Sequence, residues 1–194
     1  MSTLTNPSLF LGSRIRLVVA DPAKDVDVML RWARDSEYLR LLDSDYAALQ
    51  SKKEREDNLE KYGVGNEHHF PFVIRALADD RLLGFIGLWV APAWPHRNGW
   101  VGLGIGQRED WGHGYGTEAM RLILRYGFHE LDLNRISLGL FEYNPRALRS
   151  YEKAGFVLEG RTRQDVCRDG QHHDSLWMGI LRAEWEAHNE QPSI

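Results

Sequence analysis

QREDWGHGYGTE, the segment from Gln107 to Glu118, lies between an apolar run with the alternation of a strand and one with the spacing of a helix. Glycine recurs at positions 112, 114 and 116 of this strand-to-helix junction. Bare backbone can wrap around a charged group there without interference from side chains. The first N–H groups of a helix have no partner within it and lie at the positive end of its dipole, so the segment predicts a phosphate or pyrophosphate site.

Two common phosphate-binding motifs do not fit this turn. A Walker loop ends in glycine, lysine and serine or threonine, but Thr117 directly follows Gly116 and the turn contains no lysine. A dinucleotide fingerprint would need glycine where Thr117 stands, with an acidic residue closing a strand about 20 residues further on. The remaining G-x-G-x-G pattern is also compatible with a glycine-rich helix entry that holds no ligand.

The strand before the turn, residues 101–106, alternates apolar residues with glycine. One face of such a strand packs into a core, and the other is bare backbone. Glycine weakens a strand, so the pattern predicts that a ligand or another backbone comes very close to it. A tightly packed aromatic ring is the alternative, since the chain has seven tryptophans.

The remaining periodicity predicts an alternation of strands and helices. A helix is expected over Tyr115–His129, and a second one is capped by Asn144, starts at Pro145 and ends at Gly155. Another helix starts at Pro22, and the charged helix 51–61 is expected as a solvated face over the substrate entrance. Strands are expected at 14–19, 70–75, 82–90, 136–141, 156–163 and 175–181.

Two motifs together resemble the GNAT superfamily of acyl-CoA-dependent N-acetyltransferases. They are WGHGYGTEAM from Trp111 and NPRALRSYEKAGF from Asn144, the second being the more specific. The likeness is closest to the ribosomal-protein N-terminal and spermidine-type acetyltransferases, and it covers roughly residues 70–182, more weakly 14–34. It implies an α/β (α+β) fold in three layers, with a mixed, mostly antiparallel central sheet of about six or seven strands flanked by about four helices.

The resemblance also implies acetyl-CoA as cosubstrate and assigns residues to it. The turn would hold the pyrophosphate through backbone amides, and the preceding strand would pair with the pantetheine arm. Asn144 would hydrogen-bond the pantetheine. Trp111 stands where the family commonly has glutamine or arginine, a difference of small effect because amides do most of the binding. The implied cofactor-binding residues are Leu103, Gly104, Ile105, Trp111, Gly112, His113, Gly114, Tyr115, Gly116, Thr117 and Asn144.

The implied catalytic group is Tyr151, at the position of a general acid that protonates the departing CoA thiolate. Tyr151 also falls on an apolar stripe with Ala147 and Ala154, so core packing is the alternative. A glutamate that often serves as the base in related enzymes is replaced here by Trp100. His96 and Glu142 are the candidate replacements by position, although a solvated loop histidine and a rim charge are equally ordinary roles. Otherwise the amine arrives already neutral.

These features predict an N-acetyltransferase that moves an acetyl group to a primary amine, either a protein N-terminus or a small amine, by direct attack in a ternary complex. A catalytically weak acyl-CoA-binding sensor or interaction protein is the alternative, because no carboxylate stands at position 100. Seven tryptophans and seven tyrosines suggest an acceptor site with aromatic walls.

Composition favours one cytoplasmic domain over residues 1–194, with 1–12 loose or used in a homodimer contact, and the resemblance implies that this domain is the acetyltransferase. The lone Cys167 excludes an internal disulfide, and no apolar run approaches the ~20 residues of a membrane span. A net charge of −4 argues against nucleic-acid binding. The histidine pairs at 68–69 and 172–173 predict no metal site, because neighbours in an extended segment point to opposite faces.

Overall fold

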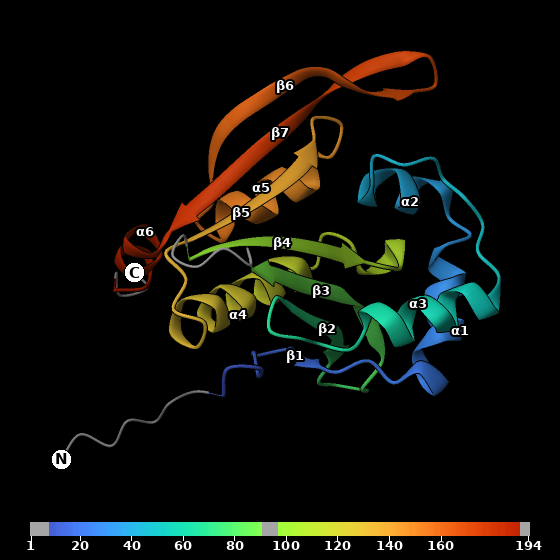
Figure 1. Cartoon of the computed structure of the whole chain (residues 1–194), viewed down its shortest axis with the longest axis horizontal. Coiled ribbons are helices and arrows are strands. Elements are labelled where there is room, and N and C mark those ends of the chain that lie inside the picture. Colours follow the sequence, from blue (N-terminus) through green and yellow to red (C-terminus); the bar gives the residue numbers. More distant parts are fainter. Residues whose placement is uncertain (1–7, 91–96, 191–194) are drawn as a thin grey trace.

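The computed structural model describes residues 8–90 and 97–190 and has a single mixed sheet at its centre (Figure 1). Its seven strands lie in the order β1-β2-β3-β4-β5-β7-β6. Only the β4–β5 pair is parallel among the pairings of the described strands. The strands are β1 (Ile15–Val18), β2 (His69–Ala76), β3 (Leu82–Val90), β4 (Asn98–Ile105), β5 (Arg135–Phe141), β6 (Val157–Arg168) and β7 (Gln171–Leu181). The predicted mixed, mostly antiparallel sheet is confirmed.

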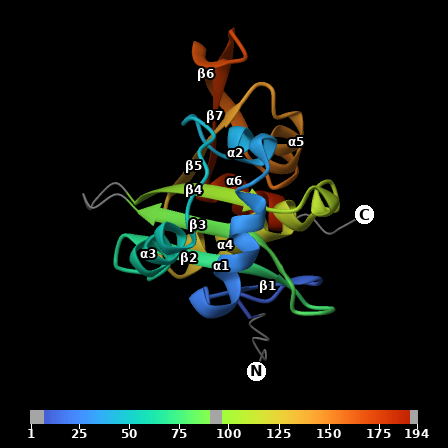
Figure 2. The same ribbon diagram turned by 90° about the vertical axis from the view of Figure 1, so that its right-hand side faces the viewer.

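Helices cover both faces of the sheet (Figures 1 and 2). The described chain has six α-helices, against the four or so expected, and a short 3₁₀ turn at Arg108–Asp110. The short helix α2 and the terminal helix α6 were not predicted. The helices are α1 (Pro22–Trp32), α2 (Ser36–Leu42), α3 (Lys52–Tyr62), α4 (Tyr115–His129), α5 (Pro145–Lys153) and α6 (Arg182–Glu190).

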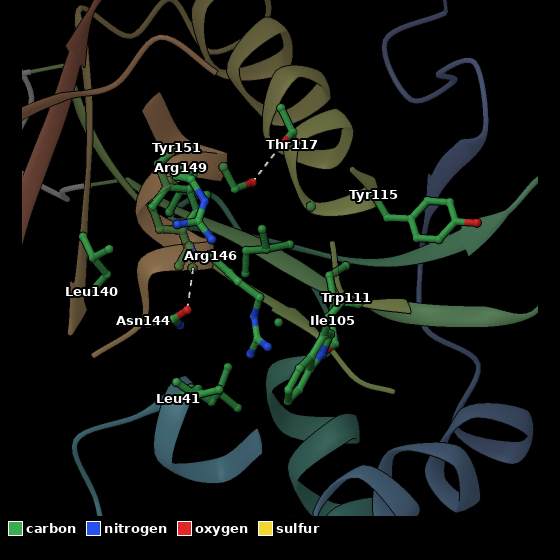
Figure 3. A pocket seen from close by; sticks show the side chains of 18 of the residues that line it. Leu41, Ile105, Trp111, Tyr115, Thr117, Leu140, Asn144, Arg146, Arg149 and Tyr151 are labelled. Carbon is green, nitrogen blue, oxygen red and sulfur yellow. Dashed lines mark hydrogen bonds between the residues drawn. The ribbon is translucent and has the colours of Figure 1, made fainter. Parts of the chain in front are cut away.

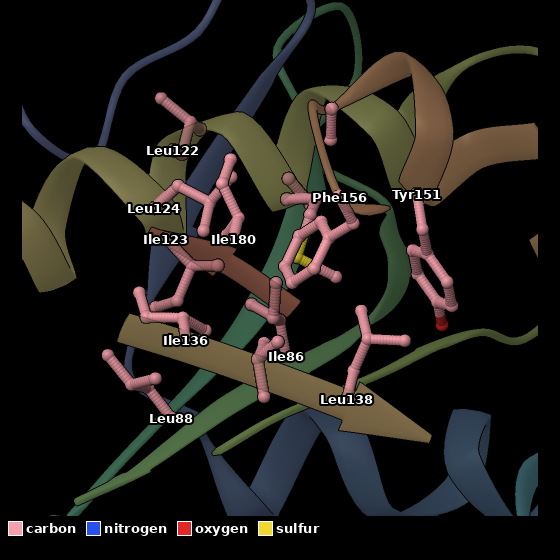
Figure 4. Close-up of a cluster of buried hydrophobic side chains, with 14 of the residues drawn as sticks. Ile86, Leu88, Leu122, Ile123, Leu124, Ile136, Leu138, Tyr151, Phe156 and Ile180 are labelled. Atoms are coloured by element: carbon pink, nitrogen blue, oxygen red, sulfur yellow. The ribbon is translucent and has the colours of Figure 1, made fainter. Parts of the chain in front are cut away.

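Alternation along the strands separates two apolar clusters and so makes three layers. Val73 of β2 packs with α1 and α2, while its neighbour Ile74 packs with the cluster beneath α4. Leu82 and Leu83 of β3 divide in the same way. The larger cluster gathers the inner faces of α4 and α5 over the sheet (Figure 4), together with Trp185 of α6. Helix α3 has no buried residue, as its charged sequence predicts.

The parallel strands β4 and β5 are paired over only part of their length. Asn98–Trp100 of β4 faces Arg135–Ser137 of β5, and beyond these residues the described ladder ends. β4 continues along β3 as far as Ile105, whereas β5 continues along β7 as far as Phe141. The strands therefore diverge and leave a backbone edge of β4 open in the middle of the sheet.

Aromatic side chains cover the glycine-rich face of β4, as the alternative interpretation of its glycines predicts. A Cβ on Gly102 would lie 3.2 Å from the ring of Trp89, and one on Gly104 would lie 2.8 Å from the ring of Phe85. Trp32 of α1 lies in the same way against Gly106. On this face the glycines therefore make room for aromatic rings that pack against the strand.

The described part of the N-terminal segment, residues 8–12, is anchored to the sheet. The Phe10 ring lies 5.3 Å from that of Phe72 and 5.4 Å from that of Tyr126, centroid to centroid. The backbone N–H of Leu17 donates a hydrogen bond to the Phe10 carbonyl at 2.8 Å. None of the helices within 8–90 and 97–190 is long and apolar enough to cross a bilayer.

Candidate active site

The gap between β4 and β5 opens into a cavity of about 780 Å³ (Figure 3). Its walls come from the open half of β4, the end of β5, the turn before α4, helix α5 and the end of α2. Cavities of this size hold cofactor-sized ligands. Most of the predicted cofactor-binding residues line it: Leu103, Gly104, Ile105, Trp111, Gly112, Gly114, Tyr115, Gly116, Thr117 and Asn144. His113 is not among the lining residues.

The turn before α4 presents backbone donors to this cavity. Gly112 and Gly114 adopt positive φ angles of 80° and 83°, and Gly114 is the helix N-cap with no capping side chain. Among the described residues, the backbone N–H groups of 112–117 donate no hydrogen bond. The left-handed turns are those that glycine adopts without strain. Free N–H groups at a helix start form an anion site, and the diphosphate of CoA fits this donor set.

Arg14 and Glu118 support the turn from outside the cavity, a pair that sequence reasoning did not identify. The Glu118 carboxylate accepts hydrogen bonds from the backbone N–H groups of Ser13 and Arg14 at 2.6 and 2.9 Å, and from Arg14 Nε at 3.0 Å. Arg14 Nη1 also donates to the His113 carbonyl at 2.7 Å. Burial alone raises the pKa of Glu118, but these hydrogen bonds outweigh it and leave the pKa below its usual value. Glu118 therefore stays ionised beside the anion site, and the guanidinium of Arg14 compensates its negative charge.

Trp111 connects the turn to the end of β4. Its indole N–H donates a 2.7 Å hydrogen bond to the Ile105 carbonyl. The guanidinium of Arg146 lies 4.0 Å from the centre of its ring, a cation–π arrangement visible in Figure 3. Tyr115 points its ring away from this group, toward Arg14, so only its backbone serves the cavity.

Helix α5 presents side chains to the cavity. Asn144 Oδ1 accepts a hydrogen bond from the Ala147 N–H at 3.1 Å, which confirms the predicted cap. Arg146, Arg149 and Lys153 line the cavity from positions i, i+3 and i+7, which share one face of a helix. None of these three cations has a carboxylate partner within the described residues. Their spacing is visible in the sequence, but the prediction did not use it.

Tyr151 serves both the core and the cavity. Its side chain is only 8% exposed and packs in the large apolar cluster, with the Phe156 ring 6.2 Å away. Its hydroxyl group has no hydrogen-bond partner among the described residues and points out of the cluster (Figure 4). Tyr151 also lines the cavity. Burial raises the pKa of this phenol to about 12, so it keeps its proton at neutral pH.

Of the two candidate bases, only Glu142 lies within the described residues. His96 lies outside the described residues. Glu142 is not among the cavity-lining residues, and its carboxylate accepts a 3.0 Å hydrogen bond from the Asp174 N–H and faces Arg161 at 3.4 Å. Trp100 lines the cavity at the position where related enzymes often have glutamate. The described residues contain no group of histidine, cysteine and carboxylate side chains arranged to hold a metal ion.

Comparisons with known proteins identify the family. The family profile described as "Acetyltransferase (GNAT) domain" matches residues 14–157. The chain belongs to the GNAT acetyltransferase family. It is 34% identical over 146 residues to the probable N-acetyltransferase YjcK of Bacillus subtilis, covering 73% of this chain and 77% of that protein. It is 31% identical over 81 residues to spermidine N(1)-acetyltransferase of Escherichia coli, covering 42% and 44%.

A solved structure confirms the fold. Spermidine N-acetyltransferase from Vibrio cholerae, in complex with CoA and spermine, superposes with a TM-score of 0.77 at 23% identity, covering 90% of this chain and 99% of that one. The GNAT fold and the acetyltransferase resemblance are thus confirmed. The protein is an acyl-CoA-dependent N-acetyltransferase by family.

Proposed function

We propose that this protein transfers the acetyl group of acetyl-CoA to a primary amine by direct attack within a ternary complex. The observation that carries the proposal is one cavity that joins the anion-binding turn, the open edge of β4 and the Tyr151 side chain. A cosubstrate bound along it can place its phosphates at one end and its thioester near a proton donor. The amine then reaches the thioester from the α2 side, where the cavity is also lined by Leu41 and Leu42.

Different parts of the cavity suit different parts of acetyl-CoA. The free N–H groups of 112–117 suit the diphosphate, and the cations of α5 suit phosphate oxygens further along. The unpaired half of β4 suits the pantetheine amides, which can add to it as a short strand. Asn144 uses Oδ1 as a helix cap, so its amide N–H₂ group is the part that can donate to the pantetheine.

Tyr151 is the proposed acid for the departing thiolate, and the proton that the amine nitrogen loses as the amide forms restores the phenol. A phenol with a pKa of about 12 is a weaker acid than a thiol with a pKa near 8.5 in water. Transfer to a solvated thiolate is therefore uphill by roughly 5 kcal/mol. The proposal thus requires the thiolate to be desolvated by the same apolar wall, which raises the pKa of the thiol as it raises that of the phenol.

Glu142 does not line the cavity and Trp100 stands where related enzymes often have glutamate, so we propose that the amine attacks in its neutral form. An α-amino group with a pKa near 8 is partly neutral at pH 7, whereas a lysine-like amine near 10.4 is not. The rate constant kcat/KM should rise with pH until the free amine is deprotonated. Tyr151 should cause no alkaline loss up to about pH 10, because its raised pKa keeps the proton in place.

The proposed function is tested by measuring free thiol release from acetyl-CoA with small amines and with peptides that have free N-termini. Acceptor-dependent release, with a mass increase of one acetyl group on the acceptor, is the expected result. N-terminally blocked peptides without lysine are the control. Tight CoA binding without release for any amine, at any pH tested, would favour the sensor that the absence of a carboxylate at Trp100 suggests.

A further inference from the structure

Two tryptophans on neighbouring strands line the cavity at the end that we assign to the acceptor. Trp89 of β3 and Trp100 of β4 are register partners, 41% and 42% exposed, on the face of the sheet that carries α1 and α2. Both line the cavity. We call this pair the tryptophan floor.

Glycines allow these rings to lie against the sheet. A Cβ on Gly87 would stand 2.9 Å from the Trp89 ring, and one on Gly139 would stand 3.4 Å from the Trp100 ring. His69 stacks on Trp89, with ring centroids 4.7 Å apart and planes at 13°, and the Trp177 ring packs against Trp100, with centroids 5.7 Å apart. The floor is therefore held in place by its surroundings while its exposed surface faces the cavity.

The carboxylates that line the cavity do not match a polycation. Of the described lining residues, the carboxylates are Asp43 and Asp110. Both Asp110 oxygens accept hydrogen bonds from Arg81 at 2.7 Å, so its charge is already compensated. Asp43, at the end of α2, has no ion pair in the described chain. One uncompensated carboxylate complements one ammonium group.

Cations lie beside the residues of the α2 region that line the cavity. Arg168 donates hydrogen bonds to the Asp43 carbonyl at 2.8 Å and to the Asp45 carbonyl at 3.1 Å. Arg55 of α3 is half-buried near Tyr38, and its Nε has no partner among the described residues. Burial lowers the pKa of Arg55, which reports the cost of holding this charge uncompensated. A second or third ammonium group on the acceptor would meet these cations.

We infer that the acceptor is a primary amine with a single positive charge and an aromatic ring, the ring stacking on the tryptophan floor. This inference rests on the proposed function and names its substrate class. Offset or edge-to-face contacts between aromatic rings add to the gain from burial, and an ammonium group is attracted to a tryptophan face before it loses its proton. A free arylalkylamine and a peptide that begins with an aromatic residue share this chemistry.

The first experiment compares two amines of equal charge with each other and with a polyamine. Thiol release is measured with 2-phenylethylamine, 2-cyclohexylethylamine and spermidine, and with peptides that differ only in an N-terminal phenylalanine or alanine. The expected kcat/KM is about tenfold higher for the phenyl compound than for the cyclohexyl compound, and higher still relative to spermidine. The peptide pair decides between a free amine and an N-terminal residue as the source of the ring. Equal rates for the two ring compounds, or a preference for spermidine, would overturn the inference.

The second experiment removes the floor. Trp100→Leu should raise KM for 2-phenylethylamine about tenfold and leave KM for acetyl-CoA within about twofold, and Trp100→Phe should recover part of the loss. Tyr62→Leu is the control, because Tyr62 is an aromatic residue, 55% exposed at the end of α3, that does not line the cavity. Calorimetry of 2-phenylethylamine with the CoA-bound protein gives the same comparison without turnover. Failure of the proposed function would abolish thiol release but not this binding, whereas unchanged binding in Trp100→Leu would contradict the inference.

Discussion

The turn before α4 and helix α5 border the same cavity, but the turn offers backbone and the helix offers side chains (Figure 3). Residues 112–117 contribute N–H groups that have no partner in the described structure. Across the cavity, Asn144, Arg146, Arg149 and Tyr151 contribute an amide, two guanidinium groups and a phenol. The turn can bind a ligand because its glycines lack side chains and expose backbone N–H groups. Helix α5 can act on the ligand through the polar groups of its side chains.

Substitutions in the turn and in α5 should affect the protein in different ways. Adding a Cβ to a glycine at positive φ strains the backbone and blocks its approach to a ligand, even though no side-chain function is lost. Truncating a side chain of α5 leaves the backbone intact but removes the group that acts on the substrate. Variants of the two regions should therefore fail in different measurements.

Tyr151→Phe is expected to have the largest effect and to act on turnover alone. The ring and its packing stay, and only the hydroxyl is lost, so kcat should fall roughly 100-fold, about 2.7 kcal/mol. Because the hydroxyl has no partner within the described residues, the melting temperature should stay nearly unchanged. Thiol release and thermal unfolding are measured on the same preparation.

Tyr143→Phe is the matched control for this prediction. The Tyr143 hydroxyl donates a 3.0 Å hydrogen bond to the Arg40 carbonyl, and Tyr143 does not line the cavity. Its removal should cost about 1 kcal/mol of stability and leave kcat within about twofold. If Tyr151→Phe behaved like Tyr143→Phe, the phenol of Tyr151 would be a packing group and no acid.

Gly114→Val tests the turn. Its φ of 83° strains a branched side chain, and the added Cβ would lie 3.0 Å from Arg14 Nη2. We expect the affinity for CoA to fall about tenfold, or 1.4 kcal/mol, with little change in kcat at saturating acetyl-CoA. The affinity is measured by calorimetry at a temperature where the variant is folded.

Gly170→Val separates strain from binding. Gly170 has a φ of 75° in the β6–β7 turn, and a Cβ there would meet nothing within 4 Å. Both variants should lose stability by a similar amount, roughly 1–2 kcal/mol, but Gly170→Val should bind CoA normally. Equal affinities in the two variants would remove the turn from cofactor binding.

Local signals explain which parts of the molecule the sequence could predict. Helix α4 runs over Tyr115–His129 as its apolar spacing indicates, and Asn144 caps α5 with Pro145 in its first turn. Each of these features depends on residues within a few positions of one another. Helix α2, with its buried Tyr38, was missed because seven residues are too few to establish a periodic pattern.

Contacts between distant segments explain most of what the sequence could not predict. The rings that cover Gly102 and Gly104 come from β3, and no local pattern on β4 identifies them. Arg14 and Glu118 are 104 positions apart, so only the fold brings them together. The basic face of α5 is different, since its helical spacing could have been found once Asn144 was taken as a cap.

Arg14→Met tests whether the turn depends on a charge outside it. Loss of the guanidinium leaves the Glu118 carboxylate uncompensated in the first turn of α4, where it repels a bound phosphate. The affinity for CoA should fall about fivefold, and Arg14→Met with Glu118→Gln should recover it to within about twofold. Arg16→Met is the control, since Arg16 pairs with the exposed Asp80. No recovery in the double variant would reduce the pair to a structural support.

Asn144→Ala has the smallest expected effect on CoA binding. Its side chain has two roles, one as the cap of α5 and one as a donor to the ligand, and only the second affects the affinity. Loss of the 3.1 Å bond to the Ala147 N–H removes a helix cap, at about 1 kcal/mol of stability. Loss of the amide N–H₂ group removes a donor to the pantetheine and should weaken CoA binding roughly threefold. Asn144→Asp separates these roles, because an aspartate caps a helix equally well but cannot donate. The expected result is native stability with the weakened affinity of the alanine variant. Native affinity in both variants, compared where all three proteins are folded, would leave Asn144 as a cap alone.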